Sequence, residues 1–392
     1  MITLTTIFWI ALSIVFYTYA GYGIVLILLV KIKELFGEKV KAVQTAHDPD
    51  VTLLIAAYNE EEIVDSKMIN TYEIDYPWEK LKIVWVTDGS NDNTNNLLSK
   101  YENVTVLYES KRSGKSAAIN RAVPLLDTSI VIFTDANTML NKESVREIVN
   151  AFLDPGVGCV AGEKRVQSGE RDGASSAGEG IYWKYESMLK SLDSRLYSAV
   201  GAAGELFAIR TELFEPVPPD TLLDDFILSM KIAERGYKIY YCKEAYATES
   251  GSANMKEEEK RKVRISAGGI QSVLRLAPLL NIFKYHIFTF QYISHRVLRW
   301  TITPFLLFAL LPINLSIVLL GGSNIYTLFL ILQILFYTGA VIGKIMADRK
   351  IKNKILYIPY YFLFMNLNVL GGIVYLTNRK RGDGTWEKSK RN

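Results

Sequence analysis

Residues 7–30 form an apolar run without a single charged side chain. Crossing the hydrocarbon core of a bilayer takes about 20 residues of α-helix, so this run is long enough to span it. Only helices and closed barrels satisfy their backbone hydrogen bonds in lipid. The sequence therefore predicts an N-terminal transmembrane anchor at residues 1–33. It also predicts C-terminal transmembrane or re-entrant helices within residues 299–378, where three more apolar stretches lie: 301–320, 325–342 and 355–376.

Basic residues next to these stretches predict their orientation. Lys31 and Lys33 directly follow the first run, and the positive-inside rule places the region after it on the cytoplasmic side. The run has no basic n-region and no obvious small-residue cleavage site, which indicates a retained anchor rather than a signal peptide. We therefore expect an integral plasma (inner) membrane protein whose central region is cytoplasmic.

The last apolar stretch, 355–376, has basic residues at both ends and contains Pro359 and the pair Gly371-Gly372. It is predicted to be a broken or re-entrant element with a cytoplasmic C-terminus, and a complete crossing is the alternative. Residues 263–298 are apolar but are interrupted by charges and a proline. They are predicted to form amphipathic helices in the membrane interface.

Residues 45–262 have the pattern of a soluble α/β domain. Continuous apolar runs at 51–57, 81–86, 104–107 and 130–133 alternate with helical patterns. This alternation predicts a Rossmann-like, mostly parallel sheet covered on both faces. Ligands of such sheets bind at the carboxyl ends of the strands. A Gly- and Ser-rich segment, 169–180, is predicted to be a mobile loop.

Acidic motifs follow apolar runs at three points of this domain: T-D-G-S with Asp88, T-D-A-N with Asp135 and Asn137, and L-D-D-F with Asp224 and Asp225. The oxygen side chains of Asp135 and Asn137 suit Mg²⁺ or Mn²⁺. Neighbouring residues of a helix point about 100° apart, so only one acid of the last motif can face a reacting group. The structural alternatives are a helix cap at the first motif, an Asx turn at the second and dipole-favoured acids at the third.

The composition argues against several other classes of protein. With 45 basic and 41 acidic residues the net charge is +4, which is too balanced to predict a nucleic-acid partner. None of the three histidines lies in an acidic motif, so a histidine-based triad or a zinc site is not expected. Cys159 and Cys242 are far apart in apolar surroundings, and buried free thiols in a reducing compartment are predicted.

In their order along the chain, the motifs resemble those of the family 2 glycosyltransferases with a GT-A fold. They are A-Y-N-E at 57–60, D-G-S at 88–90, G-K at 114–115, D-A-N at 135–137, G-E-L at 204–206 and D-D at 224–225. The likeness is closest to the membrane-bound branch that includes the cellulose, chitin, hyaluronan and poly-N-acetylglucosamine synthases. It implies inverting transfer of a sugar from a UDP-sugar to an acceptor hydroxyl, with Mg²⁺ or Mn²⁺ as cofactor.

The resemblance also implies roles for single residues. Asp225 would be the catalytic base, with Asp224 beside it. The metal ligands would be Asp135 and Asn137. The nucleotide sugar would be bound by Ala57, Tyr58, Glu60, Asp88, Lys115, Asp135 and Arg264, and the acceptor by Gly204, Glu205, Leu206 and Trp386. The basic tail at 379–392 resembles the cytoplasmic gating loop of polymerising members.

The chain departs from the family pattern in two places. The metal motif ends in Asn137 where many members carry Asp, and the signature Q-x-x-R-W retains only its arginine, Arg264. The expected function is extension of an exported or cell-surface polysaccharide from UDP-N-acetylglucosamine or another UDP-hexose. The alternatives are transfer of one sugar to a polyprenyl-phosphate or glycolipid acceptor, and a non-catalytic nucleotide-sugar-binding subunit of a synthase complex. Membrane lipids, and an oligomeric or accessory subunit, are further expected partners.

Overall fold

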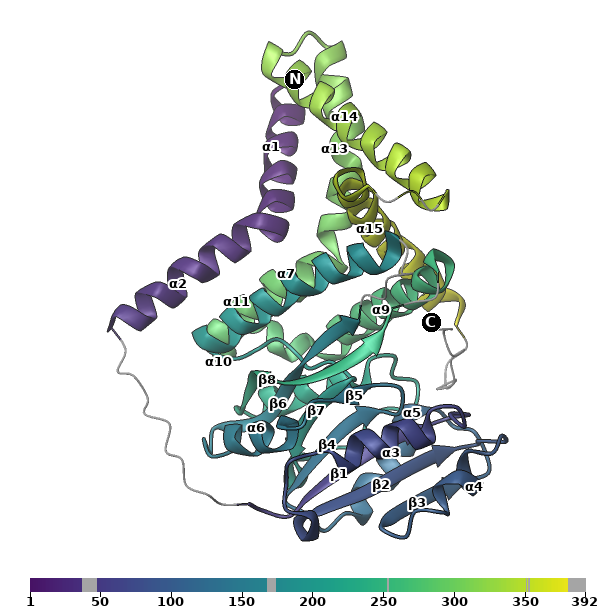
Figure 1. Cartoon of the computed structure of the whole chain (residues 1–392). Coiled ribbons are helices and arrows are strands. Elements are labelled where there is room, and N and C mark those ends of the chain that lie inside the picture. The colour runs from purple at the N-terminus through teal and green to yellow at the C-terminus, as the bar shows by residue number, and fades with distance from the viewer. Residues whose placement is uncertain (37–47, 168–173, 252–253, 350, 352, 380–392) are drawn as a thin grey trace.

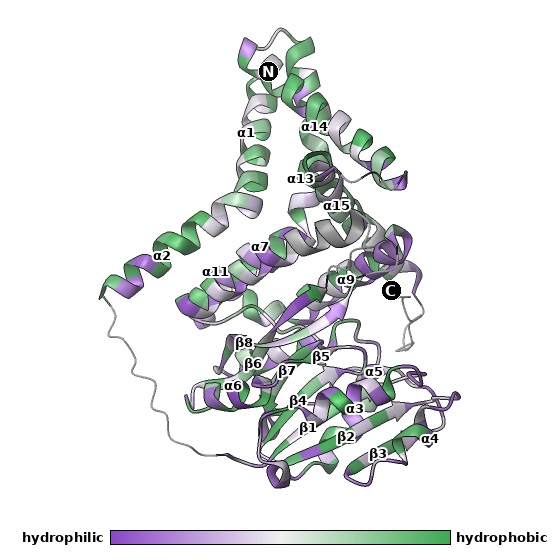
Figure 2. Ribbon diagram, viewed as in Figure 1, coloured by the Kyte–Doolittle hydropathy of each residue, from purple (hydrophilic) through white to green (hydrophobic). Residues whose placement is uncertain are grey.

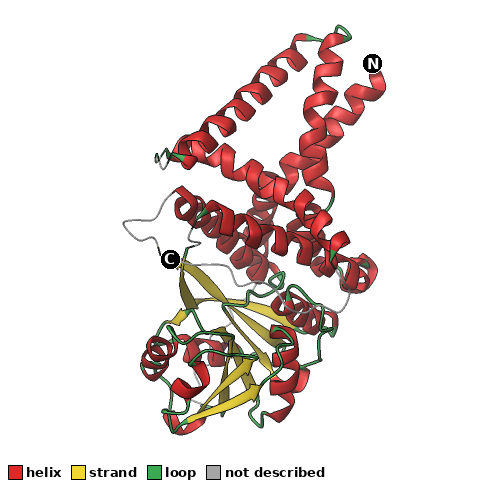
Figure 3. Ribbon diagram, turned by 90° about the vertical axis from the view of Figure 1, so that its right-hand side faces the viewer, coloured by secondary structure: helices red, strands yellow, loops and turns green. Residues whose placement is uncertain are grey.

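The computed structural model of the chain describes residues 1–36, 48–167, 174–251, 254–349, 351 and 353–379. All strands gather at one end of the molecule and only helices occur at the other, with a layer of helices between them (Figures 1 and 3). Trp386, almost all of the predicted basic tail and the first part of the predicted loop at 169–180 lie outside the described residues.

The strands form one eight-stranded sheet with the order β3-β2-β1-β4-β7-β6-β8-β5. The predicted parallel half is confirmed, and it contains β1 (Val51–Ala57), β2 (Leu81–Asp88), β3 (Val104–Glu109) and β4 (Ile130–Asp135). β7 runs antiparallel to its neighbours β4 and β6, which makes the sheet mixed. The sequence did not predict the strands of the second half: β5 (Met139–Leu140), β6 (Val157–Gln167), β7 (Leu206–Arg210) and β8 (Lys238–Ser250).

Helices cover both faces of the sheet, as predicted for buried parallel strands. Leu54 of β1 packs into one core with residues of α5 (Lys115–Ala122) and α8 (Asp224–Glu234). Its neighbours Leu53 and Ile55 face the opposite core, which includes residues of α3 (Val64–Tyr72) and α6 (Ser144–Ala151). α4 (Thr94–Leu98) lies on this second face. The carboxyl ends of β1, β2 and β4 therefore open toward one edge.

The first apolar run forms a bent helix. α1 (Ile2–Phe16) continues through a π-helical turn, η1 (Tyr17–Gly21), into α2 (Tyr22–Phe36). Such a turn inserts an extra residue and is a known cause of kinks. α1 packs against α13 (Ile302–Leu319), whereas α2 packs against α7 (Ala174–Leu196), beside which it lies in Figure 1.

The prediction of a loop at 169–180 is wrong for residues 174–180, which belong to α7. Helix stability in proteins comes mainly from tertiary packing rather than from local propensity. Here Leu189, Leu192 and Leu196 pack against Tyr22 and Leu26 of α2. This packing anchors a helix whose Gly- and Ser-rich start is unfavourable by itself.

Four helices among the described residues are long and apolar enough to cross a membrane: the run Ile2–Phe36, α13, α14 (Asn324–Asp348) and residues Ile355–Asn378 of α15 (Lys354–Asn378). α1, α13 and α14 consist mainly of hydrophobic residues and stand away from the sheet (Figure 2). Between them and the sheet lies a layer that contains α7, α9 (Met255–Arg275), α10 (Ile282–Tyr285), α11 (Ile287–Tyr292) and α12 (Leu298–Trp300).

α15 differs from the predicted broken element, because it continues through Pro359 as one helix. It lies along α9. Near its start the Tyr361 hydroxyl donates to Glu258 at 3.1 Å, and just after its end Arg379 donates to the carbonyl of Asp220 at 3.1 Å. α15 is therefore held near its start by α9 and after its end by the segment before α8.

α9 extends across the predicted domain boundary between residues 262 and 263. It is one continuous helix from Met255 to Arg275. It begins where the side chain of Asn254 accepts hydrogen bonds from the backbone N–H groups of Lys256 and Glu257, the arrangement of a typical N-cap. The predicted domain 45–262 and the predicted interface helices 263–298 therefore share one helix.

Close packing of α15 on α9 depends on Gly372. A Cβ atom at this position would lie 2.7 Å from the backbone nitrogen of Ala267. Gly372→Ala should therefore overpack the contact and lower the free energy of unfolding by about 1–3 kcal/mol. The melting temperature of the detergent-solubilised full chain measures this effect. Gly339→Ala is the matched control, because its Cβ would meet no atom closer than 3.7 Å. Equal melting temperatures for the two variants would contradict this packing.

Candidate active site

A cavity of about 570 Å³ opens at the carboxyl ends of β1, β2 and β4 and extends to the helices of the membrane side. It brings together most of the residues singled out in the sequence: Ala57, Tyr58, Glu60, Asp88, Lys115, Asp135, Asn137, Gly204, Glu205, Asp224, Asp225 and Arg264. Leu206 does not line the cavity. It is 1% exposed and pairs with Thr134 inside the sheet, so it lies behind the cavity wall.

Asp88 connects the end of β2 to the loop before α5. One carboxylate oxygen accepts hydrogen bonds from the backbone N–H groups of Ser113 and Gly114 at 2.8 and 2.6 Å. The other oxygen is buried without a hydrogen bond and lies 3.8 Å from Arg121. Asp88 therefore does not cap α4, the alternative raised by the sequence, and it retains a buried acceptor atom beside the cavity.

A flat surface lies next to Asp88. The guanidinium group of Arg112 stacks over the ring of Tyr58, 3.7 Å from its centroid, and both residues line the cavity. Stacked planar groups of this kind offer a face on which a nucleobase can lie.

Asp135 ends β4 and forms an ion pair with Lys115, the first residue of α5, at 2.6 Å. Burial by itself would lower the pKa of this lysine. The carboxylates of Asp135, Asp224 and Asp225 outweigh that effect and raise the pKa of Lys115 above its usual value. Lys115 is therefore a permanent positive charge among three acids.

The turn after Asp135 rests on Lys67, which is fully buried. Its ammonium group donates to the carbonyl of Thr138 at 2.6 Å and to the hydroxyl of Thr134 at 3.3 Å. Lys67 thus fixes Thr134, which precedes Asp135, and Thr138, which follows Asn137. These contacts position the side chains of Asp135 and Asn137 at the cavity.

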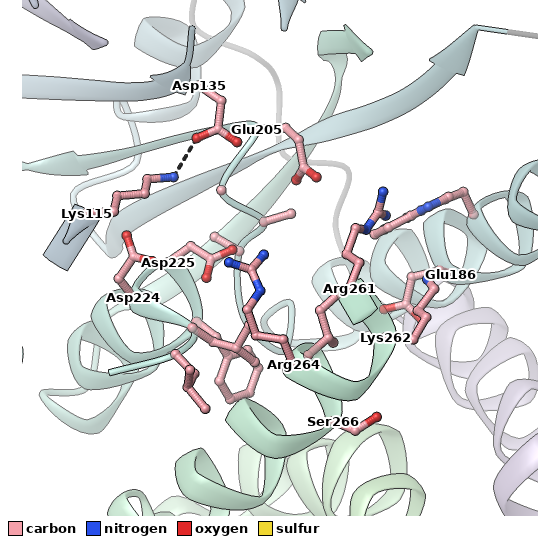
Figure 4. A pocket seen from close by; sticks show the side chains of 18 of the residues that line it. Lys115, Asp135, Glu186, Glu205, Asp224, Asp225, Arg261, Lys262, Arg264 and Ser266 are labelled. Carbon is pink, nitrogen blue, oxygen red and sulfur yellow. Dashed lines mark hydrogen bonds and ion pairs between the residues drawn. The ribbon is translucent and has the colours of Figure 1, made fainter. Parts of the chain in front are cut away.

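Asp224 and Asp225 open α8 and point in different directions, as expected for neighbours on a helix. Asp224 points toward Lys115, and Asp225 points toward the guanidinium of Arg264 (Figure 4). Desolvation in the cavity, followed by the negative charge of Asp224, raises the pKa of Asp225 to about 7. A carboxylate of this basicity is suited to general-base chemistry at neutral pH.

Gly204 leaves the space that Asp225 needs. A Cβ atom at Gly204 would lie 3.3 Å from both the Asp225 carboxylate and the Lys115 ammonium group. Next to it, Glu205 pairs with the buried Lys164, and this cation is the main reason why the pKa of Glu205 lies below its usual value despite burial.

The comparison with known proteins agrees with this geometry. Residues 49–268 match the family described as "Glycosyltransferase like family 2". The chain belongs to glycosyltransferase family 2.

Relatives and solved structures extend this result. The chain is 27% identical to a poly-beta-1,6-N-acetyl-D-glucosamine synthase of Staphylococcus aureus (strain COL) over 237 residues, which cover 57% of this chain and 56% of that protein. A beta-monoglucosyldiacylglycerol synthase of Trichormus variabilis is 28% identical over 167 residues, covering 40% of this chain and 34% of that protein. The chain thus spans about half the length of the Staphylococcus aureus synthase and about a third of the Trichormus variabilis synthase.

The fold extends over nearly the whole chain in one solved structure. A mannosyltransferase from Pyrobaculum calidifontis, in complex with GDP-Man and Mn²⁺, superposes with a TM-score of 0.69 at 21% identity. The match covers 95% of this chain and 99% of that one. Both the GT-A domain and the arrangement of helices around it are therefore shared.

The family 2 domain supplies only some of the ligands that a divalent cation needs. Among the described residues no group of three or more His, Cys, Asp and Glu side chains is placed to hold a metal. The carboxylate of Asp135 and the amide of Asn137 both line the cavity and are hard oxygen donors. They fit Mg²⁺ or Mn²⁺ if further oxygens, such as those of a diphosphate, complete the coordination.

Sequence reasoning missed the membrane-side half of the cavity. It is lined by Trp183 and Lys190 of α7, by Arg296, Arg299 and Trp300 before α13, and by Tyr361 of α15. Arg296 and Arg299 both pair with Glu186, and the buried His295 lies between Glu186 and Asp193.

Asp225→Asn should abolish turnover, because an amide cannot accept the acceptor proton. The expected loss is about 10²–10⁴-fold in kcat, whereas nucleotide-sugar binding should be retained. For the unchanged protein, kcat/KM should fall as the pH drops below about 7, since protonation of Asp225 removes the base. Nucleotide release and calorimetric binding measure the two properties. Full turnover by Asp225→Asn would exclude this residue as the base.

Proposed function

We propose that this protein is an inverting glycosyltransferase that moves a sugar from a nucleotide sugar to a hydroxyl group of an acceptor delivered by the membrane. The observation that carries the proposal is the single cavity described above. It joins the acids at the sheet edge to aromatic residues of the membrane-side helices. Donor and acceptor can therefore meet at Asp225 without the acceptor leaving the membrane surface.

The donor side of the cavity suits a nucleoside diphosphate. The stacked pair of Tyr58 and Arg112 offers a face to the base, and the unpartnered oxygen of Asp88 can accept a hydrogen bond from an N–H of the base. Lys115 and Arg264 supply positive charge for the diphosphate. A UDP-sugar is the expected donor, as the resemblance implies.

The residues around Asp225 suit direct displacement. Asp225 takes the proton of the acceptor hydroxyl, the oxygen forms a bond to the anomeric carbon, and the nucleoside diphosphate leaves from the opposite face with the bonding electrons. Asp135 and Asn137 would hold Mg²⁺ or Mn²⁺, which neutralises the charge that develops on the leaving diphosphate. Arg264 lies close enough to Asp225 to stabilise its charged form before the proton is taken (Figure 4).

Extension of an exported polysaccharide is a second candidate function. The 27% identity to the poly-beta-1,6-N-acetyl-D-glucosamine synthase favours it. Both candidates use the same donor site and the same base, and they differ in whether the product becomes the next acceptor.

The purified full chain, reconstituted in liposomes, tests the proposal with a panel of UDP- and GDP-sugars. We expect release of the nucleoside diphosphate with one donor in the presence of Mg²⁺ or Mn²⁺, and loss of release with EDTA. Addition of a membrane lipid extract should raise the rate, and the product should carry one added sugar. A ladder of long products would establish the polysaccharide function instead, and absence of release with every donor would contradict both.

We further propose that the catalytic domain faces the cytoplasm and that α15 does not cross the membrane. The contacts at both ends of α15 support this orientation. Cysteines introduced at Glu244 and Thr377 should react with an impermeant maleimide from the same side, and a cysteine at Ser323, between α13 and α14, from the other. The native Cys159 and Cys242 are buried and give little background. Labelling of the first two positions from opposite sides would refute the proposal.

A further inference from the structure

The membrane-side half of the cavity holds an ammonium group that forms no ion pair with a carboxylate among the described residues. Lys190 lines the cavity, and its side chain is 4% exposed. Within the described residues it has neither a hydrogen bond nor an ion pair. Its polar surroundings are the ring faces of Trp183 and Tyr241, whose centroids lie 5.9 and 6.0 Å away. A buried ammonium group without a partner is costly, so its retention needs a reason.

Two of the three carboxylates that act on Lys190 are already paired with other cations. Glu186 pairs with Arg296 and Arg299, and Glu205 pairs with Lys164. Burial lowers the pKa of Lys190, and the nearby Arg296 lowers it further, against the effect of the carboxylates. An anion in the cavity would reverse this balance and keep the lysine charged.

Lys190 belongs to α7 in the helical layer on the membrane side of the cavity, whereas Tyr58, Asp88 and Lys115 lie at the edge of the sheet. The charges that act on it are those of Glu186, Arg296, Glu205 and Asp225. The charges that act on Arg264 include Asp135 and Asp224, which belong to the donor side. We therefore assign an anion on Lys190 to the acceptor rather than to the donor diphosphate.

The wall beyond Lys190 is apolar and aromatic. It is formed by Tyr19 of the bent N-terminal helix and by residues of α15: Tyr357, Ile358, Tyr361, Phe362, Met365, Asn366 and Val369. Asn366 is the polar exception, and its side chain accepts a hydrogen bond from the Tyr19 hydroxyl. Both elements belong to helices that are apolar enough to contact a bilayer. A ligand that reaches from Lys190 along this wall must carry an anionic group next to a hydrophobic chain.

We propose that Lys190 forms a phosphate subsite for the acceptor, and that the acceptor is a glycan or alcohol linked to lipid through a phosphate or diphosphate. This inference rests on the proposed function, which it deepens by naming the acceptor class. The phosphate binds the ammonium group of Lys190, the lipid chain follows the wall formed by Tyr19 and α15, and the acceptor hydroxyl lies at Asp225.

Binding of geranylgeranyl phosphate to the detergent-solubilised full chain tests the subsite, with geranylgeraniol and inorganic phosphate as comparison ligands. Lys190→Met should weaken binding of the lipid phosphate at least about tenfold, because a charge-assisted hydrogen bond is lost. Lys190→Arg should bind nearly as well as the unchanged protein. Geranylgeraniol should bind weakly and equally to all variants, and inorganic phosphate should bind more weakly than the lipid phosphate.

Lys284→Met is the matched control, since Lys284 is an exposed lysine of the same helical layer and lies outside the cavity. It corrects for any general loss of positive charge near the micelle. Lys190→Met removes a buried unpaired charge, so its melting temperature without ligand should not fall below that of the unchanged protein. Weak binding by this variant therefore cannot be attributed to misfolding.

Several results would overturn the subsite. Equal affinity of Lys190→Met and the unchanged protein for geranylgeranyl phosphate would do so, as would equal losses in Lys190→Met and Lys284→Met. Inorganic phosphate that binds as tightly as the lipid phosphate would identify a free ion as the ligand and would refute the lipid. Binding of a nucleotide sugar with Mg²⁺ is measured on the same samples. If the unchanged protein does not bind any, the proposed function fails, whereas normal donor binding with Lys190-independent lipid binding refutes the subsite alone.

Discussion

The active-site edge depends on a balance of charges inside a desolvated cavity. Three carboxylates, those of Asp135, Asp224 and Asp225, converge there because parallel strands and a helix start place them at one edge. Lys115, which opens α5 beside them, makes their approach possible. Lys115 does not fully compensate the unfavourable environment of Asp225, whose pKa is raised to about 7 by burial and by the negative charge of Asp224. The positive charge of Lys115 thus stabilises the cluster, and the pKa of Asp225 still remains high enough for this carboxylate to act as a base.

α9 connects the active-site edge to the helices of the membrane side. Its first half carries Arg261, Lys262 and Arg264 at the cavity, and the same helix continues into the contact with α15 at Gly372. A rigid helix with two such contacts fixes the distance between the cations and the membrane-side wall. The boundary between catalytic and membrane parts, which composition drew at residue 262, is therefore not a hinge but the middle of a helix.

The parallel half of the sheet and the donor-side residues could be predicted from sequence because both depend on local patterns. Continuous apolar runs end in acidic motifs, and the topology of parallel strands brings those ends together without further information. The second half of the sheet, which mixes parallel and antiparallel pairs, has no comparable pattern, since β7 is short and both β6 and β8 contain charged residues. The continuity of α15 through Pro359 depends on tertiary contacts with α9, which no local rule contains.

The membrane-side half of the cavity shows why a site can escape sequence analysis even when its residues are visible. Lys190 is an ordinary lysine of a helix in the sequence, and its significance arises only because Arg296 and Arg299, more than a hundred residues later, occupy Glu186. If Lys190 paired with Glu186, the two charges of this helix would neutralise each other, and Lys190 would not be available to bind a ligand. The competition between cations for a limited number of carboxylates leaves one ammonium group buried without a partner. The two ring faces and the nearby carboxylates offset only part of the cost of burying this charge, which favours an anion at this position.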